Sequence, residues 1–127
     1  MIITIPFKTP TINHLHGFWR GHVVLKAAAK RLKKEIKEII EKAEDNNISG
    51  IINNVSGIKL KVHADIYEDW YYKNGAICRK DIANREKFLI DAVFDALLID
   101  DKHIFESSFR KVQSDEEKAI ITIEIIE

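Results

Sequence analysis

The sequence predicts an α/β (α+β) fold: one domain, residues 1–127, in which a mixed four-stranded sheet carries two main helices on one face. Three observations lead to this prediction. The chain of 127 residues is long enough to enclose one hydrophobic core, and 46% of its residues are hydrophobic. Four stretches have the pattern of strands, and two have the periodicity of helices. Their order along the chain is strand, helix, strand, helix, strand, strand.

The strands are predicted from β-branched residues and from alternation. The stretch 58–72 places Leu60, Val62 and Ile66 on one side and charged or polar residues on the other, which is typical of a strand with one buried face. The dipeptide Asn74-Gly75 that follows is a turn signal. The predicted strands are residues 1–6, 58–72, 103–113 and 119–126.

The first helix is predicted over residues 25–43, where apolar residues recur at steps of three and four. Its opposite face is rich in lysine and includes Lys26 and Lys30. Charge of this kind usually forms a solvated face, and it would also suit phosphate contacts if the protein binds DNA. Residues 44–57, rich in Asn, Ser and Gly, are predicted to form a connection with a short turn inside it.

Residues 11–22 are predicted to form an ordered loop or a small hairpin with glycines at its bends. The segment contains three of the five histidines together with Trp19 and Arg20. Three uses of these side chains are open. They can stack on a base or hold a phosphate, the histidines can bind a metal, or the aromatic rings can simply pack on the core.

Composition narrows the class of protein. No apolar run approaches the roughly 20 residues of a membrane span, and the N-terminus lacks the pattern of a signal peptide. Cys78 is the only cysteine, so an internal disulfide cannot form and we expect a cytoplasmic protein. The net charge of zero conceals 14 basic against 8 acidic residues in 1–80, and 6 against 12 in 81–127. That division suits phosphate binding by one region and metal binding by another, although such an imbalance also arises by chance.

The stretch 79–101 concentrates the residues with chemical potential. Asp81 directly precedes the predicted second helix and can cap its free N–H groups. Acidic side chains near an apolar helix cost free energy unless their charge is compensated, and a divalent cation compensates it. The acidic pair Asp100-Asp101 follows the helix, whose surface carries one polar stripe of Asn84, Lys87, Asp91 and Asp95. Lys87 can form an ion pair with an aspartate or stabilise the negative charge that develops on a phosphodiester.

These residues resemble the signature of the RusA-like Holliday-junction resolvases, a family of small homodimeric, magnesium-dependent endonucleases. The signature is an aspartate, one residue, a second aspartate followed by asparagine, and a lysine three residues later; an Asp-Ala-hydrophobic segment and a pair of aspartates come next. The opening IPFKTPTINHLHGFWRGHVVLKAAAK is similar to the first strand, turn, basic hairpin and helix of the family, so the resemblance covers nearly the whole chain. The matching residues are Asp81, Asn84, Lys87, Asp91-Ala92-Val93 and Asp100-Asp101, and Ala83 replaces the second aspartate.

The resemblance implies a crossover junction endodeoxyribonuclease that needs Mg²⁺ and acts as a homodimer on four-way DNA junctions in recombination and repair. Asp81 and Asp101 would be magnesium ligands and catalytic residues, brought together from the two ends of the helix. Lys87 would be a catalytic cation, Asn84 would order the start of the helix, and Asp100 would assist its neighbour. The DNA phosphates would be held by Arg20, Lys26, Lys30, Arg79 and Lys80.

Ala83 departs from the family signature in a way that bears on activity. A methyl group neither ligates Mg²⁺ nor supplies charge, so we expect weaker metal binding and turnover reduced by orders of magnitude. Two origins are compatible with it: a substitution introduced to inactivate the protein, or a natural relative with reduced or altered activity. Two other functions stay open, a non-catalytic junction-binding or regulatory protein that keeps the fold, and a structural dimer without a nucleic-acid role.

Overall fold

The computed structural model describes residues 1–10, 16–19, 22–25, 27–43 and 48–127. The predicted architecture is confirmed: the chain forms a single small α+β domain with a mixed four-stranded sheet. None of the described helices is long and apolar enough to cross a membrane. The elements are β1 (Ile2–Ile5), β2 (His16–Trp19), β3 (His22–Leu25), α1 (Ala27–Ala43), α2 (Ile48–Asn54), β4 (Lys59–Glu68), α3 (Ile82–Leu97), the 3₁₀ helix η2 (Asp101–His103), β5 (Ile104–Gln113) and β6 (Lys118–Ile126).

The main sheet has the strand order β1-β6-β4-β5. Its pairs are antiparallel except for β4 and β5, which run parallel because α3 carries the chain back across the sheet between them. Alternate residues of β4 are buried, as the sequence pattern predicts. The register of β4 against β5 shifts between Leu60 and Lys61, where Phe105 is the extra residue of the edge strand.

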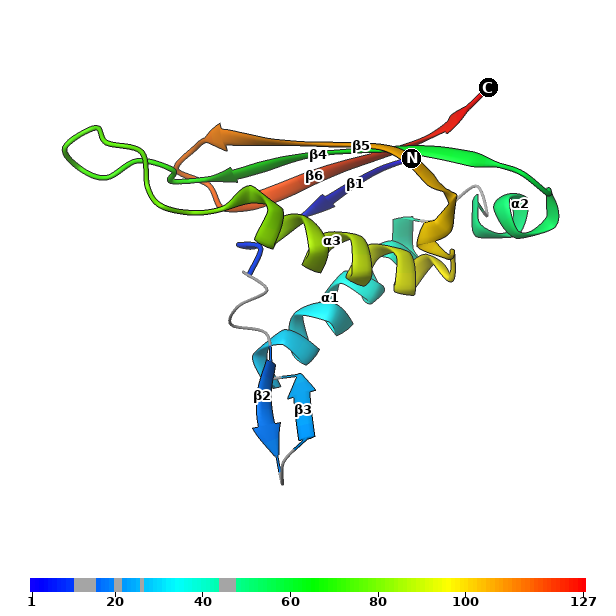
Figure 1. Ribbon diagram of the computed structural model, residues 1–127, viewed down its shortest axis with the longest axis horizontal. Coiled ribbons are helices and arrows are strands. Elements are labelled where there is room, and N and C mark those ends of the chain that lie inside the picture. The colour runs from blue at the N-terminus through cyan, green and yellow to red at the C-terminus, as the bar shows by residue number, and fades with distance from the viewer. Residues whose placement is uncertain (11–15, 20–21, 26, 44–47) are drawn as a thin grey trace.

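Helices α1 and α3 cover one face of the sheet and pack against each other (Figure 1). Both are amphipathic, so each buries one stripe of apolar side chains in a shared core. The fully buried members include Ile36 and Ile40 of α1 and Phe88 and Leu89 of α3. The second small sheet, the hairpin of β2 and β3, extends away from the main sheet beyond α1 (Figure 1). This pairing confirms the hairpin alternative, with β3 continuing to Leu25, beyond the predicted end of the segment at residue 22.

Two local predictions were wrong. The stretch 44–57 contains a helix, α2, whose Ile52 is buried in the core; the Asn, Ser and Gly content of the segment had favoured a turn. Strand β4 ends at Glu68 rather than at residue 72. It ends there because Trp70 turns into the core, where its Nε1 donates a hydrogen bond to the carbonyl of Ile66 at 3.0 Å.

Between β4 and α3 the chain forms a projection that we call the arm, residues 69–80 (Figure 1). Tyr71 and Ile77 pair as an isolated antiparallel bridge, and the predicted turn at Asn74-Gly75 closes the tip. Gly75 has φ of 86°, a left-handed conformation that glycine adopts without a steric penalty. The arm returns the chain to the sheet at the residue where α3 begins.

Candidate active site

Asp81 is the N-cap of α3. Its backbone is extended, and its side-chain Oδ1 accepts a hydrogen bond from the backbone N–H of Ala83 at 3.0 Å. This is the usual way in which an aspartate satisfies a free N–H group at the start of a helix, and its negative charge also suits the positive end of the helix dipole. Asp81 and Ala83 are both exposed. The carboxylate therefore faces solvent, where a phosphate or a cation can approach it.

The polar stripe predicted on α3 faces away from the core. Lys87 and Asp95 are exposed, and Asn84 and Asp91 are half-buried. Arg85 is a charged residue outside this stripe, because it is buried on the core side of the helix together with Phe88 and Leu89. The helix thus presents its chemically active side chains along one accessible line from Asp81 to Asp95.

Asp100 and Asp101 follow the C-terminal end of α3. Asp100 caps η2 and accepts a hydrogen bond from the backbone N–H of Lys102 at 2.9 Å. That hydrogen bond is the main reason why the pKa of Asp100 is lowered from its ordinary value, with the charge of Lys102 adding to it. Asp101 is exposed beside it. The carboxylate of Asp100 is therefore held in its charged form.

The acidic residues at this end of the helix line a pocket of about 230 Å³. Its acidic lining consists of Asp91, Asp95, Asp100 and Asp101. Even so, among the residues that the structure describes, no three His, Cys, Asp or Glu side chains come together in a way that could hold a metal ion.

Asp81 and Asp101 lie at opposite ends of α3. The helix contains 16 residues, so about 24 Å of helix separates its ends at about 1.5 Å per residue. Figure 1 shows α3 starting beside the arm and ending at the other end of the domain. Within one chain, the two aspartates therefore do not come together as expected. A rigid helix connects them, whereas a shared cation needs ligands about 2.1 Å from its centre.

The residues predicted to contact DNA are distributed over several elements. Lys30 is exposed on α1, and Arg79 is exposed at the end of the arm. Lys80 is engaged: its Nζ donates to Oε2 of Glu68 at 3.1 Å and to the carbonyl of Asp69 at 2.7 Å. Arg20 and the side chain of Lys26 lie outside the described residues.

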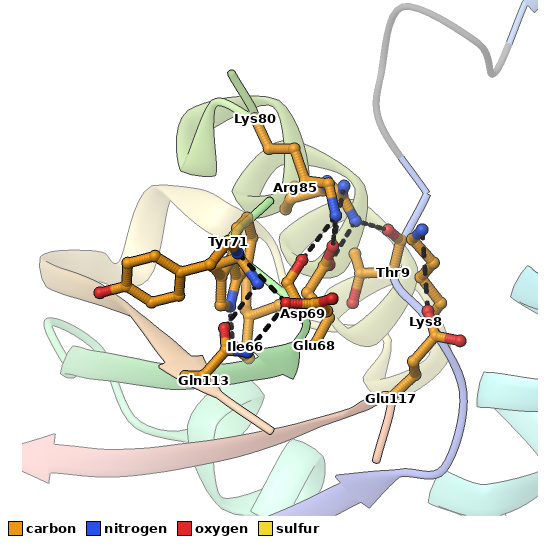
Figure 2. A network of polar contacts seen from close by, with 11 residues as sticks. Lys8, Thr9, Ile66, Glu68, Asp69, Tyr71, Lys80, Arg85, Gln113 and Glu117 are labelled. Atoms are coloured by element: carbon orange, nitrogen blue, oxygen red, sulfur yellow. Dashed lines mark hydrogen bonds and ion pairs between the residues drawn. The ribbon is translucent and has the colours of Figure 1, made fainter. Parts of the chain in front are cut away.

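Two candidate functional residues, Glu68 and Arg85, were not predicted from the sequence. They form a buried ion pair directly behind the start of α3, with Arg85 Nη1 2.7 Å from Glu68 Oε1 (Figure 2). Only the placement of an arginine on the apolar side of the helical pattern, four residues after Asp81, could have indicated this pair.

The fold and these side chains define a small α+β protein with carboxylates at both ends of one helix, an exposed polar face along it and basic residues nearby, the groups that phosphodiester hydrolysis uses. The family model of endodeoxyribonuclease RusA matches residues 6–124. The chain belongs to the RusA endodeoxyribonuclease family, whose members resolve Holliday junctions and generally depend on a divalent metal ion. Comparison of the sequence with curated proteins gave no match.

Proposed function

We propose that the protein is a Holliday-junction endonuclease that works as a homodimer, with each active site shared between two protomers. Membership of the RusA family over residues 6–124 supports the reaction. The main observation in favour of a shared site is that the whole length of α3 separates Asp81 from Asp101. If both are needed at one site, the second must come from another copy of the chain.

A twofold axis beside α3 provides such an arrangement. In a symmetric dimer, each contact occurs twice, so placing Asp81 opposite Asp101 of the partner subunit also creates the reciprocal site. The same antiparallel pairing brings Lys87 opposite Asp95, because Lys87 is six residues after Asp81 and Asp95 is six residues before Asp101. Both side chains are exposed and opposite in charge. The stripe on α3 is thus complementary at Lys87 and Asp95, whereas Asp91, midway between Asp81 and Asp101, comes opposite Asp91 of the partner subunit at the twofold axis.

In this dimer, each site combines Asp81 and Lys87 of one protomer with Asp101 of the partner subunit. The carboxylates are hard oxygen ligands suited to Mg²⁺, which when bound polarises the scissile phosphate and lowers the pKa of water. Lys87 lies near the phosphate and stabilises the charge that develops on it. Arg79 and Lys30, both exposed, hold neighbouring phosphates of the junction arms.

Ala83 lies at the point where the family signature has a second carboxylate, and its side chain is exposed beside Asp81. This observation favours a second candidate, a junction-binding protein that has the fold of the nuclease without its full activity. Loss of one of about three carboxylates removes charge and a ligand from the site, which weakens metal binding. The two candidates agree on the DNA that is bound and differ on whether it is cut.

Cleavage of a labelled four-way junction by the chain and by its Ala83→Asp variant tests the proposal. We expect the variant to cut in Mg²⁺ at least tenfold faster than the parent, because it regains a metal ligand. Ala83→Asn, which has nearly the same size without the charge, is the matched control. Binding of the junction by both proteins with no cutting by either would support the non-catalytic candidate. Equal binding to the junction and to plain duplex DNA would contradict both.

A further inference from the structure

A buried network of charged side chains joins the end of β4 to the start of α3 (Figure 2). The side chains of Glu68 and Arg85 are only 1% and 3% exposed. Arg85 Nη1 donates to Glu68 Oε1 at 2.7 Å, and Lys80 Nζ donates to Glu68 Oε2 at 3.1 Å. Arg85 also donates to the carbonyl of Thr9, which connects the segment after β1 to the same point.

This network is poorly explained by stability alone. Charged groups lose much hydration free energy when they are buried, and well-packed apolar residues often replace such a pair without loss. Among the residues that the structure describes, neither Nε of Arg85 nor Oγ1 of the buried Thr9 has a hydrogen-bond partner. An unpaired buried donor costs further free energy. The arrangement therefore calls for a role besides holding the domain together.

Asp81 lies between the two cations that contact Glu68. Lys80 directly precedes Asp81 in the chain, and Arg85 follows it by about one helical turn. One buried carboxylate at the end of β4 thus holds the chain on both sides of Asp81. The carboxylate of Asp81 is itself exposed, and within the described part of the chain it accepts a hydrogen bond from the N–H of Ala83 alone, so its place depends on these two attachments.

The base of the arm supports the same point. The ring of the buried Trp70 lies near three cations, with its centroid 5.7 Å from Lys80 Nζ, 5.6 Å from Arg85 Cζ and 4.9 Å from Lys111 Nζ. The side chain of Gln113 accepts a hydrogen bond from the backbone N–H of Trp70 at 2.7 Å. These contacts place the base of the arm against Lys80 and Arg85, the two cations that also bind Glu68.

We propose that Glu68 and Arg85 are positioning residues, which fix the carboxylate of Asp81 for the active site. The inference rests on the proposed function, because it takes Asp81 to be part of that site. In the proposed site, neither Glu68 nor Arg85 contacts the DNA or the metal. Glu68 acts through Lys80 and Arg85, and Arg85 acts through the first turn of α3.

The test compares three variants with the parent. Each variant is made twice, once in the chain with Ala83 and once in the chain with the Ala83→Asp change. Glu68→Gln removes the charge that holds both cations. The double variant Glu68→Leu/Arg85→Met replaces the buried pair by apolar side chains of similar size and so preserves stability. Asp65→Asn is the matched control. Asp65 is in β4, like Glu68, but it lies on the open face of the sheet, where it forms a bidentate ion pair with Arg110 of β5.

Two measurements are made on each protein. The first is hydrogen exchange at the amide of Ala83, which reports whether the Asp81 carboxylate is in place and needs no activity. The second is the Mg²⁺ concentration that gives half-maximal junction cleavage. In Glu68→Gln and in the double variant, we expect exchange at Ala83 to accelerate and the Mg²⁺ requirement to rise, each about tenfold or more, with the rate at saturating Mg²⁺ little changed. Amides in the middle of α3 and the Asp65→Asn control should keep the parent values.

The outcomes are separable. If the double variant unfolds at the parent temperature and keeps both the Ala83 protection and the Mg²⁺ requirement, the pair is structural and the inference is wrong. If exchange accelerates equally along all of α3, the pair stabilises the helix as a whole and positioning is also contradicted. If no protein in the set cuts the junction, the proposed function fails, and the exchange at Ala83 alone decides whether Glu68 holds Asp81 in place.

Discussion

At the scale of single residues, Asp81 has two tasks that substitution can separate. As an N-cap, it needs only a side-chain oxygen, which asparagine supplies equally well, whereas alanine loses about 1 kcal/mol of stability. As a metal ligand, it needs the negative charge. We therefore expect Asp81→Asn to unfold like the parent, Asp81→Ala to be about 1 kcal/mol less stable in denaturant unfolding, and both to lose cleavage. If Asn and Ala are equally destabilising, the hydrogen bond to Ala83 is not a cap.

Asp65 gives the clearest expectation for pH. Partial burial would raise its pKa, but hydrogen bonds from Arg110 and His63 outweigh this effect and lower the pKa from its ordinary value of 3.8. A lowered carboxyl pKa adds stability that is complete above the unfolded pKa and is lost as the pH falls through the folded value. We expect the stability difference between the parent and Asp65→Asn to be constant above about pH 5 and to shrink below 3.8.

Urea unfolding at several pH values from 2.5 to 7 measures that difference. Arg110→Met, which removes the main partner, should give nearly the same pH profile as Asp65→Asn. A difference that grows as the pH is lowered would mean that the folded pKa is raised.

At the scale of elements, the end of α3 contains a residue in an unfavourable conformation. Leu98 is the C-cap with φ of 58°, it is 79% exposed, and its N–H bonds to carbonyls of the last turn. Glycine adopts this conformation without the penalty of about 1–2 kcal/mol that a side chain incurs. We expect Leu98→Gly to raise the unfolding free energy by roughly 0.5–1 kcal/mol after the entropy of glycine in the unfolded chain is counted.

Gly75→Ala is the converse control for this prediction. Gly75 has φ of 86°, and an added Cβ would meet nothing within 4 Å, so the only cost is that of the backbone. It should destabilise by about 1 kcal/mol. Loss of stability in Leu98→Gly would show that the leucine side chain contributes packing that outweighs its backbone strain.

The elements that could be predicted from the sequence are those with strong periodicity. Strands β4, β5 and β6 and the helices α1 and α3 follow patterns that depend on local residues alone. The helix α2 could not be predicted in this way, because burial of Ile52 in the core stabilises a segment whose composition favours turns. Trp70 ended β4 early for the same kind of reason: only the folded core offers the Ile66 carbonyl to its indole.

For the candidate site, too, the local features could be predicted from the sequence and the contacts between distant residues could not. The N-cap at Asp81, the stripe on α3 and the exposed pair Asp100-Asp101 were predicted correctly as local features, because helical spacing determines them. Their mutual distances were not, since a straight helix of 16 residues keeps its ends apart whatever their charge. Glu68 and Arg85 were missed because their meeting depends on the packing of β4 against α3, which no local pattern encodes.

At the scale of the whole molecule, the shared site makes a prediction that no single variant can test. Asp81→Asn and Asp101→Asn are each expected to abolish cleavage, because every site in either homodimer lacks one aspartate. In a dimer of one protomer of each kind, one site contains both substitutions and the other contains Asp81 and Asp101 intact. We therefore expect activity to return when the two inactive proteins are mixed and their subunits exchange. Half of the dimers are then mixed and each has one good site, so about a quarter of the sites of the active parent are restored.

The kind of product distinguishes this recovery from contamination by active protein. A mixed dimer with one intact site nicks one strand of the junction, whereas a dimer with two sites makes the symmetric pair of cuts. Mixing Asp81→Asn with Lys87→Ala is the matched control, because both residues belong to the same half of the site and no combination of these protomers restores it. The measurement is made in whichever parent cuts, the chain with Ala83 or the Ala83→Asp variant. If the first mixture stays as inactive as the second, Asp81 and Asp101 do not meet across the dimer. Because α3 also keeps them about 24 Å apart within each protomer, the two aspartates would then share no site.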